Sequence, residues 1–357
     1  MRVPALVLML FLVACGSVQQ PISASPVMPP AVEINAMERR LRAALPHIDA
    51  AAIHALAAYV QDDGRRCRIP GGTLASAPCH VVPVPGFSSR LRAVYRVHTD
   101  DAARGHVIAV RGTANAGDLF TDVDTELVDD PVLPFQVHRG FQRFATAIRA
   151  DLERRGLPRP GYSVTLTGHS LGGATALLLG LYLYNDPRHS AQVATVITFG
   201  QPKVFGNAGA LTFPDFYDQR LLRVVHCADP VPIVPVSDSV GGNLLAIGFF
   251  RGRRVDDYEH AGRSLLLLPG GRYWKPGTTD VDRDLPASLR QLIASVRDDH
   301  PFHTHQMAGY RALLGKLADP ASQAAHPRTP EGACETGPAK DPGDGPMPQR
   351  VASVVTR

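Results

Sequence analysis

The chain contains 357 residues, of which 45% are hydrophobic and 20% are charged, and its formal net charge is +4. This length can bury one large core and is compatible with one or two domains. Because the net charge is small for the length and no run of basic residues stands out, the charge gives no basis for a nucleic-acid partner. Nothing in the sequence identifies a protein partner.

The first 15 residues have the pattern of an export signal. Arg2 supplies a positive start, and Ala5–Val13 is an apolar run too short to span a bilayer permanently. The run ends in L-V-A-C, which resembles the lipobox of bacterial lipoproteins, in which Cys15 becomes the lipidated first residue. Gly16 stands where inner-membrane lipoproteins have Asp, so we expect an outer-membrane protein held by lipid chains on Cys15. An ordinary secretory peptide, giving a periplasmic or secreted protein, is the alternative.

Residues 16–34 are rich in proline, serine and glutamine, which predicts a flexible linker. The folded domain then begins with two helices. Asn35, with Glu38 three residues later, resembles a capping box and starts the first helix, which Pro46 interrupts. Ala50–Val60 is the second helix, with its larger aliphatic residues on one face.

The cysteine positions predict one disulfide bond after these two helices. Cys67 and Cys79 flank a loop containing proline and glycine, and in an oxidising compartment we expect them to pair, with a stabilisation of about 3 kcal/mol. Cys227, in a strand expected to be buried, and Cys334, near the C-terminus, are expected to be unpaired. Two lone cysteines do not indicate a metal site.

The centre of the chain alternates β-prone runs with helical patterns. The predicted strands are Val81–Val84, Leu91–Val97, His106–Val110, Tyr162–Thr167, Val193–Phe199 and Leu221–Cys227. Phe141–Arg155 is an amphipathic helix, and an Ala/Leu-rich helix follows Ser170. Gly117–Pro134 is acidic, with one short helical face, and forms either a solvated surface or a cover over the site. This alternation predicts an α/β fold with a largely parallel central sheet flanked by helices.

Beyond Cys227 the pattern is looser. It predicts strands at Asn243–Arg251 and Ser264–Leu268 and helices at Leu285–Arg297 and His305–Leu317. Residues 319–357 are rich in proline, glycine and alanine, which predicts a disordered tail. The folded domain is therefore expected to cover residues 35–318.

The stretch Val164–Gly180 passes from a β-prone run through G-H-S-L-G, centred on Ser170, directly into a helix. This is a G-x-S-x-G nucleophile elbow in the strand–turn–helix context that it requires. A Cβ at Gly168 or Gly172 would crowd the neighbouring strand and helix, and the sharp turn strains the serine backbone. The helix N-terminus would direct the Leu171 amide at the oxyanion formed when Ser170 attacks a carbonyl.

A serine hydroxyl needs a base, usually histidine, that a carboxylate orients. In α/β-hydrolases the acid follows the serine in the chain, and the histidine follows the acid. Asp229 fits the acid because it lies in a proline-rich turn at the carboxyl end of a predicted strand, where such folds place their active sites. Asp215 and Asp218, before that strand, are weaker candidates.

Four histidines follow Asp229 and are candidates for the base. His260 lies in a charged stretch and is expected at the surface. His300, His303 and His305 precede the last helix closely together, and position alone does not choose among them.

Five segments, in the same order along residues 110–310, resemble those of the class 3 (fungal-type) triacylglycerol lipases. They are Arg111-Gly112-Thr113, Val137-His138-Arg139-Gly140-Phe141, Thr167-Gly168-His169-Ser170-Leu171-Gly172-Gly173, Phe199-Gly200-Gln201-Pro202-Lys203 and Asp229-Pro230-Val231-Pro232. Their shared order argues against coincidence. The resemblance implies an α/β-hydrolase fold with a mostly parallel central sheet.

The resemblance also implies roles for single residues. Ser170 would be the nucleophile and Asp229 the acid that orients the base. Thr113 would be an oxyanion donor through its backbone N–H and its hydroxyl, beside the Leu171 amide. Asp122, nine residues after Thr113, matches the family aspartate that holds this hydroxyl in place.

The family's histidine is often followed by methionine two residues later and by tyrosine five residues later. His305, Met307 and Tyr310 repeat this spacing, so the resemblance favours His305 as the base, with His303 as the second choice. Leu119-Phe120 stands where the family usually has a tryptophan beside its lid, which leaves activation by a moving lid open.

We therefore expect a serine hydrolase that acts on lipid esters, triacylglycerol or phospholipid, through an acyl-Ser170 intermediate. No metal or cofactor is expected, because the sequence contains no H-E-x-x-H motif and no cluster of Cys and His ligands. An esterase for small soluble esters such as feruloyl esters, and a catalytically inactive lipid-anchored binding protein, are the alternatives. A serine protease or acyltransferase is a weaker one, because the matched segments belong to lipases. Residues 230–300, which would shape the acyl pocket, leave substrate choice open.

Overall fold

The computed structural model describes residues 31–59, 61–62, 66–67, 77–86, 92–113, 126–235, 258–268, 272–274 and 303–318. The chain divides into two compact units, Met1–Arg40 and Leu41–Arg357. Of the first unit only residues 31–40, the beginning of helix α1, are described. All other described elements belong to the second unit.

A ten-stranded sheet forms the centre of the second unit. Its strands, in spatial order, are β1 (Gln61–Asp62), β2 (Arg66–Cys67), β3 (Ala77–Pro83), β4 (Arg92–Asp100), β5 (Gly105–Val110), β8 (Ser163–His169), β9 (Val193–Phe199), β11 (Leu221–His226), β13 (Arg263–Leu268) and β14 (Arg272–Trp274). The strands from β5 to β13 pair in parallel, and those at both edges pair antiparallel. The predicted α/β fold is confirmed.

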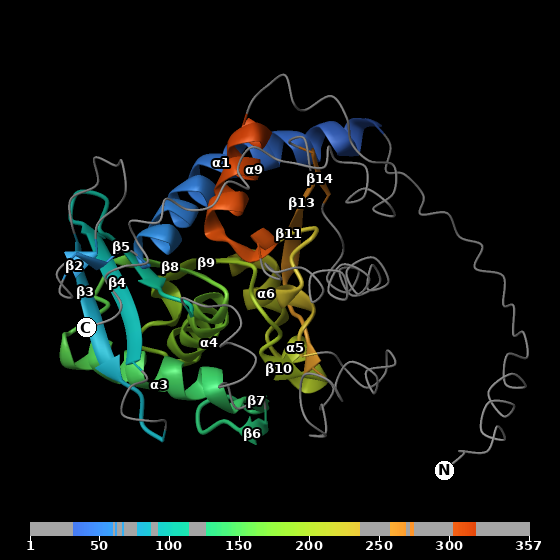
Figure 1. Cartoon of the computed structure of the whole chain (residues 1–357). Coiled ribbons are helices and arrows are strands. Elements are labelled where there is room, and N and C mark those ends of the chain that lie inside the picture. Colours follow the sequence, from blue (N-terminus) through green and yellow to red (C-terminus); the bar gives the residue numbers. More distant parts are fainter. Residues whose placement is uncertain are drawn as a thin grey trace, which may run out of the picture. The chain divides into compact units, whose positions relative to one another are not determined.

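Helices cover both faces of this sheet (Figure 1). On one face, α3 (Arg139–Arg154), α4 (Leu171–Asn185) and α6 (Pro214–Arg220) pack in a large apolar cluster with side chains of β4, β5 and β8. On the other face, α1 from Leu41 onward and α9 (Met307–Ala318) pack with β9, β11 and β13. Burial on both faces explains why these strands are continuous apolar runs.

A second, smaller sheet has the order β12 (Tyr258–Glu259), β10 (Phe205–Gly206), β7 (Gln136–His138) and β6 (Leu127–Asp129), all antiparallel. Short helices complete the described elements: η1 (Ser190–Gln192), α5 (Asn207–Thr212), η2 (Val231–Ile233) and η6 (His303–His305). The sequence patterns did not predict the small sheet, because strands of two or three residues are too short to show a period.

Helix α1 runs from Ala31 to Ala57 without a break. The prediction of two helices is therefore wrong, and Asn35 lies inside the helix instead of capping it. Residues 31–34, which the composition assigns to the linker, are helical, and the helix ends before the predicted Val60.

Pro46 lies inside α1 with its ring exposed to solvent. A proline removes one intrahelical hydrogen bond and crowds the preceding turn, which favours a break. Leu41 and Ile48, on either side of it, are both buried in the same apolar cluster. Packing of the flanking turns thus outweighs the local preference of the proline.

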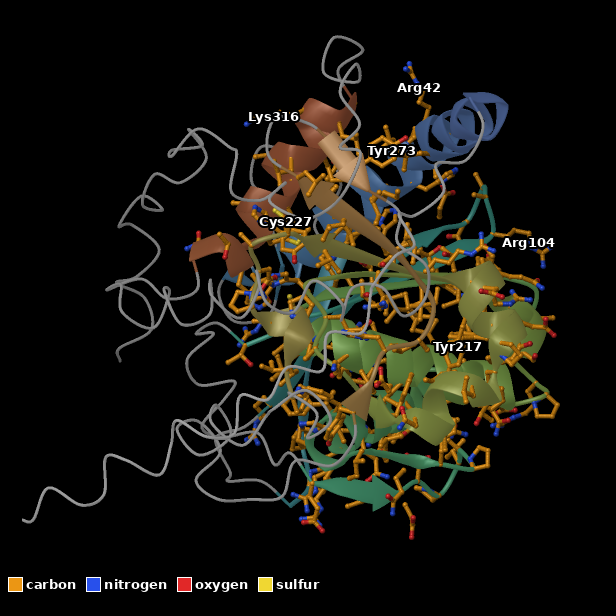
Figure 2. The ribbon with its side chains drawn as sticks, turned by 90° about the vertical axis from the view of Figure 1, so that its right-hand side faces the viewer. Arg42, Arg104, Tyr217, Cys227, Tyr273 and Lys316 are labelled. Atoms are coloured by element: carbon orange, nitrogen blue, oxygen red, sulfur yellow. The ribbon has the colours of Figure 1, made fainter. Side chains whose placement is uncertain are left out.

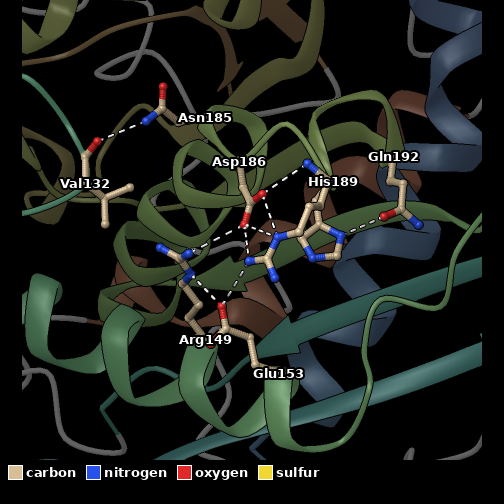
Figure 3. A network of polar contacts seen from close by, with 8 residues as sticks. Val132, Arg149, Glu153, Asn185, Asp186, His189 and Gln192 are labelled. Carbon is tan, nitrogen blue, oxygen red and sulfur yellow. Dashed lines mark hydrogen bonds and ion pairs between the residues drawn. The ribbon is translucent and has the colours of Figure 1, made fainter.

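Charged residues join the C-terminal parts of α3 and α4 (Figure 3). Arg149 Nη2 of α3 lies 3.6 Å from Asp186 Oδ2, directly after α4, and Arg188 Nη2 lies 2.6 Å from the same oxygen. Hydrogen bonds from Arg188 are the largest cause that lowers the pKa of Asp186 to about 2. These contacts fix the turn that leads from α4 towards β9.

Two cysteines of the described chain, Cys79 and Cys227, are each disulfide-bonded. The expectation that Cys227 is unpaired is therefore wrong. Cys227 (labelled in Figure 2) lies in a turn directly after β11 and is only half-buried, whereas the sequence pattern placed it inside a buried strand. For Cys79, the β2–β3 register pairs Cys67 with Ala77, two residues before Cys79, which brings the two backbones close.

The other predicted elements of the chain centre are present with ends shifted by a few residues. Several predictions lie outside the described residues: the signal segment 1–15, residues 16–30 of the linker, the helical face at 119–123, Asn243–Arg251, Leu285–Arg297 and the tail 319–357. None of the helices in the described ranges has both the length and the apolar character that crossing a membrane requires.

Candidate active site

Four neighbouring parallel strands end beside one another at the same edge of the large sheet. The β5–β8 register pairs Val110 with Gly168, and the β8–β9 register pairs His169 with Phe199. The Gly200 N–H, just after β9, donates to the carbonyl oxygen of Val224 in β11 at 3.0 Å. The turns that follow these strands therefore bring together segments far apart in sequence, as expected for the carboxyl ends of parallel strands.

Ser170 forms the sharp turn between β8 and α4. Its φ of 61° and ψ of −134° are a strained combination for a residue with a side chain. A Cβ at Gly168 would lie 2.3 Å from the carbonyl oxygen of Gly172, and one at Gly172 would lie 2.3 Å from that of Val110. The predicted reason for both glycines is confirmed, because only bare backbone fits at these contacts.

Asp229 and His305 form a buried pair across 76 residues of sequence. His305 Nδ1 lies 2.7 Å from Asp229 Oδ2, and the side chains are 3% and 0% exposed. The other carboxylate oxygen, Oδ1, accepts the Val231 N–H at 2.8 Å, which fixes the carboxylate plane. Asp229 therefore holds one ring nitrogen of His305 and leaves Nε2 for another partner.

Tyr310 provides a further hydrogen bond to this carboxylate. Its hydroxyl donates to Asp229 Oδ2 at 2.6 Å from the second turn of α9. Burial, followed by the charge of Asp229, raises the pKa of Tyr310 well above its usual value, so the hydroxyl stays a donor. The sequence spacing picked out Tyr310 only as a marker for His305 and assigned it no contact.

Gly200 leaves the space in which these groups meet. Its φ is +54°, and a Cβ there would lie 2.7 Å from Asp229 Oδ2, 2.9 Å from the Tyr310 hydroxyl and 3.0 Å from His305 Cε1. Sequence reasoning treated Gly200 only as part of a family segment. The sequence feature that could have indicated this role is the position of Gly200 directly after β9, the strand that pairs with β8 before Ser170.

Ser170 and His305 flank the same short stretch of backbone. The Ser170 N–H donates to the Phe199 carbonyl oxygen at 2.9 Å, directly before Gly200, whose Cβ position adjoins His305. The ring of His169 lies 4.5 Å from that of His305, centroid to centroid. Within the described part of the chain, Ser170 Oγ and His305 Nε2 are both buried and have no hydrogen-bond partner. The candidate nucleophile and the candidate base thus each keep one polar atom without a partner.

Of the remaining predicted site residues, the structure describes two and leaves two outside its described ranges. Leu171 is the first residue of α4, where backbone N–H groups have no intrahelical partner, and its side chain is buried. Thr113 follows β5 at the same sheet edge and is half-buried. Asp122 and Cys15 lie outside the described residues.

The competing candidates differ in where the structure places them. Asp215 and Asp218 are exposed on α6. His260 is 5% exposed, and its Nε2 lies 2.6 Å from the Pro232 carbonyl oxygen, so its predicted surface position is wrong. Burial, then the charges of Arg223 and Lys203, lower the pKa of His260 well below its usual value. His303 lies in η6 beside His305, and His300 lies outside the described residues.

His138, in the H-x-G-F segment, has a structural function. Its Nδ1 accepts the backbone N–H groups of Gly140 and Phe141 at 3.1 and 3.4 Å, which caps the N-terminus of α3. Its ring also stacks on Phe141 at 3.9 Å between centroids. Across the described ranges, no group of three or more His, Cys, Asp or Glu side chains is placed to hold a metal ion.

Comparison with known proteins finds sequence similarity to lipases over part of the chain. Residues 107–239 match the family model Lipase (class 3). A lipase of Rhizopus niveus is 35% identical over 134 residues, which are 36% of this chain and 34% of that protein. The secreted mono- and diacylglycerol lipase 1 of Fusarium solani is 33% identical over 147 residues, 39% of this chain and 42% of that protein.

A plant relative matches as well: the phospholipase A1 EG1 of Oryza sativa subsp. indica is 38% identical over 157 residues, 44% of this chain and 34% of that protein. The chain spans less than half the length of these curated relatives. Among solved structures, the nonglycosylated Yarrowia lipolytica LIP2 lipase aligns with a TM-score of 0.50 at 19% identity, covering 67% of this chain and 87% of that one. This likeness shows the fold, which is that of the α/β-hydrolases.

Proposed function

We propose that this protein is a serine carboxylic-ester hydrolase that acts on lipid esters through an acyl-Ser170 intermediate. The observation that carries the proposal is the strained Ser170 turn beside a buried His305–Asp229 pair, with Ser170 Oγ and His305 Nε2 both without a partner among the described residues. The sequence match to class 3 lipases over residues 107–239 supports the same reaction.

In the proposed mechanism, His305 Nε2 takes the Ser170 proton as Oγ attacks the ester carbonyl. Asp229 holds His305 through Nδ1 and stabilises the imidazolium that forms. Backbone N–H groups of Leu171 and Thr113, with the Thr113 hydroxyl held by Asp122, would bind the oxyanion, each donor contributing on the order of 3 kcal/mol. His305 then returns the proton to the leaving alcohol and activates water to release the acyl group.

Lipid esters are the proposed substrates because the matched relatives are named for them. Those names include a mono- and diacylglycerol lipase and a phospholipase A1. Triacylglycerol and phospholipid are therefore the first substrates to test, and hydrolysis should increase with acyl chain length. A preference for feruloyl or other short soluble esters would contradict the lipid substrate but leave the proposed serine mechanism unchanged.

The experiment that tests the mechanism is the intact mass of the protein after treatment with a fluorophosphonate, with wild type beside Ser170→Ala. One adduct on wild type and none on the variant is the expected result, because only an activated serine reacts. Repeating the treatment with detergent or lipid present distinguishes a covered site from an inactive one. A folded wild type that stays unlabelled in both conditions contradicts the proposal and favours a binding protein without activity.

A lipid anchor on Cys15 is proposed for the exported protein. Residues 1–15 are proposed as the signal peptide, residues 16–34, apart from their helical end, as the linker, and residues 319–357 as a disordered tail. The supporting observation is the L-V-A-C sequence at the end of the apolar run. Cys15→Ser should move the protein from the outer-membrane fraction to the periplasm. Unchanged membrane partition would refute the anchor.

Cys67 is proposed as the disulfide partner of Cys79. The two residues approach through the β2–β3 register, and Cys79 is disulfide-bonded. Peptide mapping without reduction should recover a linked pair containing both cysteines. A linked peptide joining Cys79 to a different cysteine would contradict this assignment.

A further inference from the structure

One tyrosine hydroxyl contacts both sides of the candidate site. Tyr59 lies directly after α1, where its backbone N–H donates to the Leu56 carbonyl oxygen at 3.0 Å. Its hydroxyl lies 2.9 Å from His169 Nδ1 and 3.4 Å from the His169 carbonyl oxygen. The hydroxyl also lies against Gly112, where a Cβ would be 2.3 Å from it. A single oxygen therefore joins α1 to the turn after β5 and to the last residue of β8.

Gly112 makes this approach possible. A Cβ at this position would lie 2.3 Å from the Tyr59 hydroxyl, 2.4 Å from the His169 carbonyl oxygen and 3.1 Å from Ser170 Cβ. Any side chain here would displace either the tyrosine or the serine turn. The chain thus brings the two turns together as bare backbone and fills the space between them with a hydroxyl.

The two residues that the hydroxyl contacts are the immediate neighbours of the proposed catalytic groups. Gly112 precedes Thr113, the proposed oxyanion donor, and His169 precedes Ser170, the proposed nucleophile. The separation of the turns sets how far the Thr113 and Leu171 donors lie from a carbonyl bound at Ser170. Donors of this kind act only when they are held at the correct distance before the reaction.

The protonation states suit this bridge. Burial raises the pKa of Tyr59, so the hydroxyl remains protonated. Burial, then the charge of His305, lowers the pKa of His169 well below its usual value. His169 is therefore neutral and adds no second positive charge beside His305 when His305 takes the serine proton.

We propose that Tyr59 is a positioning residue, whose hydroxyl holds the oxyanion turn at Gly112 and the nucleophile turn at His169 at a fixed separation. The inference rests on the proposed serine-hydrolase function. Tyr59 lies outside residues 107–239, the stretch that matches the lipase family model, so α1 supplies this support from outside that stretch.

The test is Tyr59→Phe in the full chain, which removes the hydroxyl and keeps the ring. We expect kcat on a lipid ester to fall roughly tenfold with KM unchanged, because oxyanion donors act mainly in the transition state. Affinity for a boronic acid, which forms a tetrahedral adduct on the serine, should fall by the same factor. An unchanged kcat, or a change in KM alone, overturns the inference.

Tyr95→Phe is the matched control. The Tyr95 hydroxyl is also buried and donates to Asp151 Oδ2 at 2.6 Å, but it lies in the cluster that packs against α3, on the other face of the sheet. This variant should lower the melting temperature and leave kcat and boronic acid affinity unchanged. If Tyr95→Phe reduces both as strongly as Tyr59→Phe does, the effect is general destabilisation and the inference fails.

Labelling by a fluorophosphonate separates this inference from the proposed function. Wild type should form an adduct that Ser170→Ala does not form, and Tyr59→Phe should form it roughly tenfold more slowly. Labelling of Tyr59→Phe at the wild-type rate overturns the positioning role alone. A wild type that remains unlabelled, with and without lipid, overturns the proposed function and the positioning role together.

Discussion

Gly200 shows how closely the groups behind Ser170 are packed. Three polar groups from two distant parts of the chain, Asp229 on one side and His305 with Tyr310 on the other, surround the position where a Cβ would stand. The left-handed φ of +54° also favours glycine at this position. The geometry of the Asp229–His305 pair therefore requires that residue 200 carry no side chain.

Gly200→Ala is expected to reduce kcat/KM roughly a hundredfold, because the new methyl group pushes the carboxylate and imidazole out of line. Gly156→Ala is the matched control, since Gly156 has a similar φ of +66° and nothing within 4 Å of its Cβ position. Both variants should lose about 1 kcal/mol of unfolding free energy through backbone strain. Ester hydrolysis assays that found equal activity in both variants would contradict the crowding argument.

Asp151 illustrates a buried carboxylate with a role in stability instead of catalysis. Burial tends to raise its pKa, but hydrogen bonds from Tyr95, Arg155 and Arg154 outweigh this and lower the pKa to about 2. Because the pKa in the folded state is below the unfolded value, the stabilisation is present above about pH 4 and is lost as the pH falls towards 2.

Asp151→Asn should therefore reduce the free energy of unfolding at pH 7 by about 2 kcal/mol, and the difference from wild type should vanish near pH 2. Urea denaturation at several pH values measures both. Asp49→Asn, at an exposed position in α1, is the control and should change stability little. A constant difference across pH would show that packing, and not charge, is responsible.

Helix α1 is the element for which local preference and tertiary packing disagree most. Pro46 is exposed in its interior, while the turns on either side are buried against the sheet. The helix therefore carries the cost of the proline without any packing of the ring to offset it.

Pro46→Ala should raise the free energy of unfolding by about 1–2 kcal/mol, because the restored hydrogen bond exceeds the greater freedom of the unfolded chain. His47→Ala, at the neighbouring exposed position, should change it by less than about 0.5 kcal/mol. Urea denaturation of both variants is the measurement. A loss of stability in Pro46→Ala would show that the proline is needed where it stands.

Across the protein, buried histidines make folding sensitive to acid. Burial is the largest cause that lowers the pKa of His54, His169 and His260, and that of His54 falls to about 4. Each of these groups binds a proton more readily in the unfolded chain than in the folded one. The unfolded state is therefore favoured as the pH falls below the ordinary histidine value of about 6.5.

We expect the free energy of unfolding to fall between pH 6.5 and pH 4, by about 1.4 kcal/mol per pH unit for each such histidine. Urea denaturation at intervals across this range is the measurement. His54→Gln removes one titrating group and should reduce the slope, whereas His47→Gln, at an exposed site, should not. A flat profile in wild type would contradict the burial argument.

Local sequence was sufficient for the features that depend on neighbouring residues. The Ser170 elbow, its two glycines, strand Val193–Phe199 and the amphipathic helix α3 all follow from periodicity or from backbone sterics over a few positions. Strand and helix alternation likewise predicted the α/β class. These features need no information about distant parts of the chain.

Tertiary structure decided what depends on distant contacts. The continuity of α1 through Pro46, the burial of His260 and the disulfide at Cys227 all contradict their local patterns. The space at Gly200 and the Tyr59 bridge exist only because parallel strands end side by side. Residues that are distant in sequence come into contact there. A local periodic pattern cannot predict such a contact, because it depends on two separate segments at once.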